Sequence, residues 1–396
     1  MTVSPTIAET TLTDTSPACP GLAGSGPAGT APAEPVTAPA DPGSTRRSRR
    51  CRAMRQFVRA PRQLAGSLAV ILSVVTVTFL VTRVLAPDPT SLFIGTSGAG
   101  DAEARAAQTA KVRAGLGLDD SIPHQYVRFL GQLVHGDLGT SFQTGRGVSH
   151  DLAARFPATA ELAVYSLIIG VGLGITAGIV SAVRRGRLAD GLSRALTIGS
   201  LAMPQFWIGL MLLWVFYTKL HLAPGPVGRL PIGESPPPTI TGFYLVDAVL
   251  TGHGSTALDA LRQLALPVVT LSLGLAAPIA KVVRTSMVEA FGSDYVRTAV
   301  ALGFGRRRIW FVYALKNGLL PVLTMLANVI AFTFVGSILV EGVFGWPGIG
   351  NYALKAIQDS DFPAVQGFVL YATVLYVVVY ELLVVAYRRV DPRVRP

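Results

Sequence analysis

Six long apolar stretches constrain the fold of this chain more than any other feature of its sequence. They cover about residues 64–86, 161–183, 196–218, 264–283, 319–340 and 365–387. At about 1.5 Å of rise per residue, each is long enough to cross a hydrocarbon core of about 30 Å as a helix. A segment inside a bilayer must satisfy its backbone hydrogen bonds internally. The sequence therefore predicts an all-α membrane protein with six transmembrane helices.

The distribution of charge sets the expected orientation of these helices. The chain is 50% hydrophobic and only 14% charged, whereas soluble proteins carry about 25% charge. Basic residues gather at the two ends of the chain and in alternate connections, namely 46–62, 184–194, 281–316 and 388–395. The positive-inside rule places these segments and both termini in the cytoplasm. The net charge of +11 thus reflects membrane topology, and we expect no nucleic-acid partner.

Two segments outside the spans have distinct compositions. Residues 1–56 are rich in Pro, Ala and Thr and end in a basic run, so we expect a disordered cytoplasmic tail before a transmembrane domain over 57–396. The run Arg46–Arg50 is more typical of a topology anchor than of a lipid-binding site. In the external loop 87–158, scattered Leu and aromatic residues favour small amphipathic helices on the outer surface.

The basic connection 284–318 differs from an ordinary loop. Ala, Arg, Val and Leu dominate on both sides of Gly303–Gly305, which predicts a helix, a break at the glycines and a second helix. Such an element at the inner face of a membrane suggests docking of a cytosolic partner. A solvated connection with a purely topogenic charge is the alternative.

The segment DYVRTAVALGFGRRRIWFVYALKNGLLPVLT, residues 294–324, resembles the EAA loop of ABC-transporter permeases in the dipeptide and oligopeptide importer family. The matching positions are Asp294, Tyr295, Arg297, Thr298, Ala299, Gly303, Ala314, Asn317 and Pro321. Arg297 and Thr298 stand where the general consensus has Glu and Ala, and the distance from Gly303 to Pro321 is longer than in sugar permeases. Both departures are usual in the peptide branch. Residues 340–367 and the terminal RRVDPRVRP also resemble this family.

The resemblance implies a machine of several chains in the bacterial inner membrane. A second, homologous permease would enclose the pathway, two cytosolic ATPases would hold the coupling loops, and an external binding lipoprotein would deliver peptide. This chain has no glycine-rich loop followed by Lys-Ser or Lys-Thr, so we expect ATP and its Mg²⁺ on the partner subunits, with no cofactor and no catalytic residue here. Arg297 and the run Arg306–Arg308 would pair with acidic groups of the ATPase or with lipid phosphates. The expected docking residues are Glu289, Asp294, Tyr295, Arg297, Thr298, Ala299, Gly303, Arg306, Arg307, Asn317 and Pro321.

Other positions carry weaker signals. Gly170, Gly174 and Gly178 recur every four residues and indicate close helix packing rather than a substrate path. Glu341, at the outer end of the fifth apolar stretch, is the candidate for the translocation path. Glu381 could belong to a proton relay, but a structural ion pair or a subunit contact is the favoured interpretation.

Competing functions have less support in the sequence. The five histidines lie in external segments without metal-ligand spacing, so we expect no metal site. A permease for nickel or another small solute is the nearest alternative. A secondary transporter should show repeated halves and broken helices, and no repeat is evident. A membrane enzyme would need a polar catalytic cluster, which these residues do not form.

Overall fold

Helices make up nearly all the regular structure of the computed structural model, in which residues 65–82 and 120–390 are described. Among these residues the β-structure is limited to an isolated bridge between Thr140 and Gly147. The predicted disordered tail and the first part of the predicted external loop, up to residue 119, lie outside the described residues.

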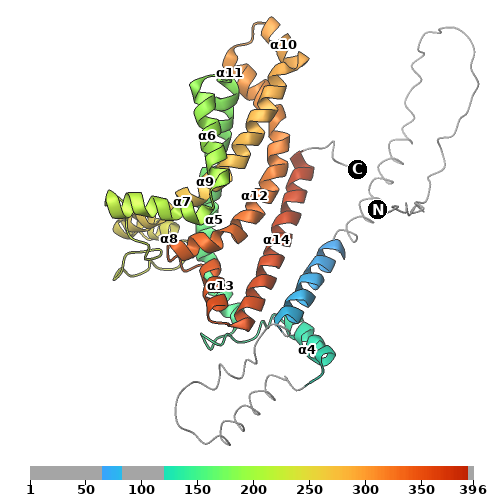
Figure 1. Ribbon diagram of the computed structural model, residues 1–396, viewed down its shortest axis with the longest axis vertical. Helices are drawn as coiled ribbons and strands as arrows, with labels where there is room; N and C mark the ends of the chain where they lie inside the picture. The colour runs from blue at the N-terminus through green and yellow to red at the C-terminus, as the bar shows by residue number, and fades with distance from the viewer. Residues whose placement is uncertain (1–64, 83–119, 391–396) are drawn as a thin grey trace, which may run out of the picture. The chain divides into compact units, whose positions relative to one another are not determined.

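The elements follow one another along the chain as shown in Figure 1. They are an unlabelled first helix Ala65–Thr82, α4 Ile122–Val134, α5 Val148–Val183, α6 Leu188–Ala202, α7 Gln205–Leu212, the π-helix η1 Leu213–Lys219, α8 Tyr244–Leu250, α9 Gly254–Gly292, α10 Asp294–Ala301, α11 Arg306–Arg308, the π-helix η2 Ile309–Leu315, α12 Lys316–Val343, α13 Ile349–Gln358 and α14 Phe362–Val390.

Four of the described helices are long and apolar enough to cross a membrane: the first helix, α5, α9 and α14. A bent pair formed by α6 with α7 and η1 makes a fifth crossing if it is counted as one span. The predicted fifth stretch, 319–340, lies within α12, which is 28 residues long. The helices extend beyond several predicted stretches: α5 begins inside the predicted external loop, and α9 continues into the predicted cytoplasmic loop. Six spans and two cytoplasmic termini remain predictions.

The third apolar stretch, 196–218, is not one continuous helix. The chain leaves α6 at Met203, which has an extended conformation, and α7 begins after Pro204. The two arms are bent by 109°. Pro204 accounts for the break, because its ring disfavours a helical conformation for the residue before it. Gly209 lies inside α7 against the Phe344 ring.

Close contact between α5 and α9 depends on the three regularly spaced glycines of α5. A Cβ atom at Gly170 would lie 2.9 Å from the Leu275 Cβ, and one at Gly174 would lie 2.8 Å from the Ala276 carbonyl oxygen. At Gly178 it would lie 2.6 Å from the Val283 Cβ. Successive glycines meet successive turns of α9, so the two helices run parallel. The glycines lie where the backbones approach most closely.

The first helix packs against α4 and α14. Its Phe79 ring lies 5.5 Å from the ring of Phe129 in α4, a helix of 13 residues within the predicted external loop. The Ser67 hydroxyl donates to the Glu381 carboxylate of α14 at 2.9 Å. Glu381 therefore makes a polar contact between two helices that are far apart in sequence.

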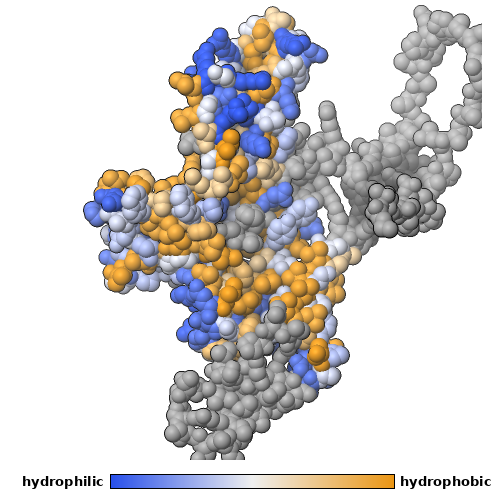
Figure 2. Space-filling model, viewed as in Figure 1, coloured by the Kyte–Doolittle hydropathy of each residue, from blue (hydrophilic) through white to orange (hydrophobic). Residues whose placement is uncertain are grey.

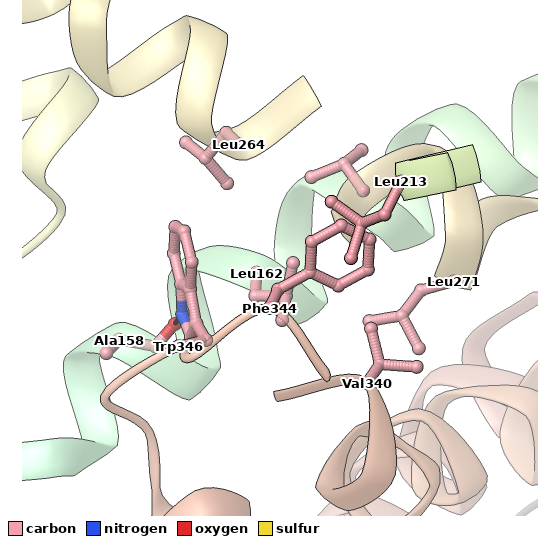
Figure 3. Packing of buried hydrophobic residues seen from close by; sticks show 9 residues of the cluster. Ala158, Leu162, Leu213, Leu264, Leu271, Val340, Phe344 and Trp346 are labelled. Carbon is pink, nitrogen blue, oxygen red and sulfur yellow. Dashed lines mark hydrogen bonds between the residues drawn. The ribbon is translucent and has the colours of Figure 1, made fainter. Parts of the chain in front are cut away.

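A cluster of buried apolar side chains fills the space where α5, η1, α9 and the end of α12 meet, and most of its members are labelled in Figure 3. Trp346 has 1% of its surface exposed, and its indole N–H donates to the Ala158 carbonyl at 2.8 Å. The chain bends directly before this tryptophan, with Gly345 at φ 63°. The tryptophan is buried in the core, where its ring fills the gap between α5 and α9.

Candidate functional site

Many of the basic residues of the described chain gather at one end of the helix bundle, called here the basic end. It is formed by the turn 184–187, the start of α6, the last turns of α9, and α10 with α11. The contact between Asp190 of α6 and Arg284 of α9 joins these segments. Figure 2 shows hydrophilic residues over α6, α10 and α11, next to a more apolar region of the bundle.

The short helix α10 projects at this end, directly after α9. A single residue, Ser293, separates the two helices, and its extended backbone redirects the chain. Val296 and Ala299 are 3% and 2% exposed, so one side of α10 is held against the bundle. Its neighbours there are the last turns of α9 and the π-helix η2. The small side chain of Ala299 permits this close packing.

The predicted helix–glycine–helix pattern is confirmed. After α10 the chain turns at Gly303, whose φ of 78° favours glycine, and α11 begins after Gly305. The ring of Phe304 stacks on Tyr313 of η2, with 5.6 Å between ring centroids. The Arg308 guanidinium lies 4.4 Å from the Phe304 ring centroid. These contacts hold the turn against the element that leads into α12.

The opposite side of α10 is open to solvent. The side chains of Asp294 and Arg297 are 97% and 73% exposed and lie 3.6 Å apart, so their ion pair contributes little to stability. Tyr295 and Val300 add exposed apolar surface. Thr298, Gly303, Arg306 and Arg307 are exposed as well. Of the other expected docking residues, Glu289 is exposed on α9, while Asn317 and Pro321 belong to the first turns of α12.

The end of the bundle opposite the basic end contains several buried carboxylates, of which Glu341 and Glu161 lie in separate polar networks. Glu341, at the end of α12, is fully buried. It accepts hydrogen bonds from the Thr159 hydroxyl at 2.8 Å, the Ser337 hydroxyl at 3.2 Å and the Asn351 N–H at 2.9 Å. The Thr159 oxygen in turn accepts from the Ile349 N–H at 2.8 Å. Glu341, the predicted path residue, thus lies inside a network that joins α5, α12 and α13.

Glu161, two residues beyond Thr159 on α5, is also fully buried and pairs with Arg229. The guanidinium donates to one carboxylate oxygen through Nε at 3.1 Å and Nη2 at 2.5 Å, and Nη2 also donates to the Gly242 carbonyl at 2.7 Å. The Leu245 N–H donates to the second carboxylate oxygen at 3.0 Å. Arg229 lies 3.4 Å from the centroid of the Tyr244 ring. The pair fastens the connection between η1 and α8 to the first half of α5.

Asp247 of α8 holds this connection from the other side. Its carboxylate accepts hydrogen bonds from the Thr241 hydroxyl at 2.7 Å and from the backbone N–H groups of residues 240–242. Burial raises the pKa of Asp247, but these hydrogen bonds lower it by more, so its pKa lies below the usual range. The folded connection therefore favours the charged form of this carboxyl.

The described residues hold no group of three or more His, Cys, Asp or Glu side chains that could bind a metal ion. The described bundle has a projecting helix at the basic end and buried polar networks, among them those of Glu341, Glu161 and Asp247, at the other.

Comparison with known proteins assigns this architecture to a family. The family described as "Binding-protein-dependent transport system inner membrane component" matches residues 174–396, and the N-terminal family of the same system matches residues 54–163. The chain belongs to this family of ABC-transporter permeases. It is a multi-pass inner membrane protein and a transport subunit, not a catalytic one.

Relatives of the permease cover most of its length. The probable D,D-dipeptide transport system permease protein DdpB of Escherichia coli K12 is 40% identical over 329 residues, 83% of this chain and 95% of the relative. The dipeptide transport system permease protein DppB of the same strain is 33% identical over 86% of this chain and 99% of its own length. The di/tripeptide permease DppB of Pseudomonas aeruginosa UCBPP-PA14 is 34% identical, with 84% and 97% covered.

Several structural roles in this permease were not evident from the sequence. Arg229 is a single charge in a segment rich in Pro and Gly, and nothing local indicates that it is buried against Glu161. Asp190 and Arg284 lie 94 residues apart, yet two nitrogens of the guanidinium bind both carboxylate oxygens at 3.0 and 3.2 Å. The sequence gives only a general indication of these ion pairs. A charge at the end of an apolar helix is stable when buried only if it has a partner.

Proposed function

We propose that this permease forms half of the membrane pathway of an ATP-driven importer of dipeptides and oligopeptides. The observation that carries the proposal is the form of α10. One side of this helix is held to the bundle through Val296 and Ala299, and the other presents Asp294, Tyr295 and Arg297 to solvent. A helix that is fixed on one side and exposed on the other suits docking into a groove of a cytosolic subunit.

The connection of α10 to α9 suits transmission of movement. The 39 residues of α9 extend over about 58 Å, from the outer end of the bundle to the base of α10. Because Ser293 is the only residue between the helices, displacement of α10 displaces the inner end of α9. The glycine contacts couple α9 to α5, whose first half contributes Thr159 and Glu161 to the networks of Glu341 and Arg229. A push at the basic end can thus reach the opposite end through packed helices.

The complete machine in this proposal has several chains. A second, homologous permease would complete the pathway, and two cytosolic ATPases would bind ATP and Mg²⁺ and hold the two coupling helices. An external binding lipoprotein would deliver the peptide. The names of the relatives, which are dipeptide or di/tripeptide permeases, support a peptide cargo. The basic end would then face the cytoplasm, in agreement with the positive-inside rule.

The test is ATP hydrolysis by the permease with its co-purifying subunits in lipid nanodiscs, with the binding protein and with or without short peptides. Peptide and binding protein together should stimulate hydrolysis. Arg297→Ala should lower the stimulated rate about 10-fold or more, because a charge-assisted hydrogen bond contributes about 1.5–3 kcal/mol. Arg185→Ala is the matched control, since Arg185 is an exposed arginine of the basic end outside α10.

Each outcome has a distinct meaning. If no ATPase co-purifies, the importer proposal is wrong. If Arg297→Ala and the control behave alike, α10 is not the docking element that we propose. If ATP hydrolysis responds to nickel and not to peptides, the importer proposal stands but its substrate is nickel.

A further inference from the structure

A pocket of ≈ 380 Å³ lies between α6 and α9 at the basic end of the bundle. Its lining combines cationic and apolar side chains from both helices. The cations are Arg194 of α6 with Lys281 and Arg284 of α9, and the apolar side chains are Ile198, Leu201 and Ala280. The pocket is separate from α10 and from the two carboxylate networks.

The charge around the pocket is positive and only partly neutralised. Asp190, 4% exposed, accepts from Arg284, from the Ser181 hydroxyl at 2.5 Å and from the Gly186 N–H at 3.1 Å. Both of its oxygens are therefore occupied within the protein. Arg194 and Lys281 are exposed and have no ion-pair partner in the described part of the chain. The pocket thus carries a net charge that an anion would neutralise.

Along α6, a cationic side chain is followed by apolar ones, as the charged headgroup of a phospholipid is followed by its acyl chains. Arg194 lies nearer the basic end, and Ile198 and Leu201 follow four and seven residues later, about 6 and 10 Å further toward the middle of the bundle. Ile198 and Leu201 are 60% and 52% exposed despite their apolar side chains. A headgroup at the cations would therefore place an acyl chain along these two residues.

A zwitterionic peptide fits the pocket less well. Its carboxylate could bind a cation, but its ammonium group would need an acceptor of opposite charge. Asp190 is the acidic residue next to the pocket, and it is buried with both oxygens in use. The charges therefore favour a ligand that is anionic overall.

We propose that this pocket binds the phosphate headgroup of an anionic phospholipid of the cytoplasmic leaflet. Arg194 and Lys281 contact the phosphate, and the acyl chain lies along Ile198 and Leu201. Basic pockets between membrane helices on the cytoplasmic side are suited to anionic headgroups, and each nearby cation contributes about fivefold in affinity. Bound in this way, the lipid bridges α6 and α9 beside the Asp190–Arg284 pair.

Native mass spectrometry of the full chain with its co-purifying subunits tests the proposal, using dioleoylphosphatidylglycerol against dioleoylphosphatidylcholine as probes. The phosphatidylglycerol should be retained in preference. Arg194→Gln and Lys281→Gln should each lower its retention about fivefold. Arg185→Gln, which removes an exposed arginine of the basic end outside the pocket, should leave it unchanged. Thermal unfolding in phosphatidylcholine nanodiscs should be the same for all variants, which shows that they fold.

Four results would overturn the proposal. Equal retention of the two lipids would indicate that the pocket does not select an anionic headgroup. A loss of phosphatidylglycerol in Arg185→Gln as large as in the two pocket variants would indicate charge attraction to the whole basic end. Displacement of the lipid by a dipeptide such as Ala-Ala would assign the pocket to the transport path. Displacement by millimolar inorganic phosphate alone would identify a site for free anions.

Discussion

Gly178→Ala tests the close packing of α5 on α9 most directly. The added Cβ would lie 2.6 Å from the Val283 Cβ and 2.8 Å from the Ala280 carbonyl oxygen. Carbon atoms in contact are normally separated by about 3.5–4.0 Å. The helices must therefore move apart by about 1 Å at this point, along an interface that also includes Gly170 and Gly174. Overpacking of this kind costs about 1–3 kcal/mol.

A second glycine of the same helix provides the control. Gly172 is exposed, and a Cβ atom there would meet nothing within 4 Å. Gly172→Ala should therefore stabilise the protein by about 0.8–1 kcal/mol, the difference in helix propensity between the two residues. Gly178→Ala gains the same helix propensity but disrupts the packing of α5 on α9. We expect Gly172→Ala to be the more stable variant by about 1–3 kcal/mol, because the propensity terms cancel.

Equilibrium unfolding of the two variants in mixed micelles, titrated with sodium dodecyl sulfate, measures this difference. Both substitutions replace Gly by Ala within one helix, so their effects on the unfolded chain are similar. A difference below about 0.5 kcal/mol would refute the argument, because the α5–α9 interface would then have room for a methyl group at Gly178.

Three further predictions concern the end of the bundle opposite the basic end. Glu161→Gln should lower the free energy of unfolding by about 3–5 kcal/mol, because the buried Arg229 loses its carboxylate. In the same titration, adding Arg229→Met to this variant should lower the free energy of unfolding by far less than a second loss of this size, because the unpaired charge is then removed. Asp247 has a depressed pKa in the folded protein, so its stabilisation is present above the unfolded-state pKa of about 3.9 and is lost as the pH falls through the lower folded pKa. The thermal stability of the wild type should therefore fall more steeply between about pH 6 and pH 3 than that of Asp247→Asn. Equal pH dependence in the two proteins would contradict the assignment. Glu341→Ala should lower both stability and peptide uptake, measured as accumulation of labelled dipeptide; uptake at the wild-type rate would remove Glu341 from the transport path.

Features set by local composition could be predicted from the sequence. The apolar stretches predict helices because a backbone in a bilayer must form its own hydrogen bonds. Gly303 and Gly305 between good helix formers predict the break between α10 and α11, and Gly303 adopts the positive φ that the turn requires. The four-residue spacing of Gly170, Gly174 and Gly178 predicts one packed face, because those positions share a side of the helix.

Features that depend on which segments meet were decided by the tertiary structure alone. The spacing of the glycines does not say that α9 is their partner, and the third apolar stretch does not reveal a 109° bend. A carboxylate at the end of an apolar stretch is costly unless it has a partner, but Arg229 lies 68 residues from Glu161 and Thr159 lies 182 residues from Glu341. The energy of a buried charge depends on atoms within a few ångströms. Local pattern therefore shows that such a charge needs a partner, and only the packed helices determine which partner it has.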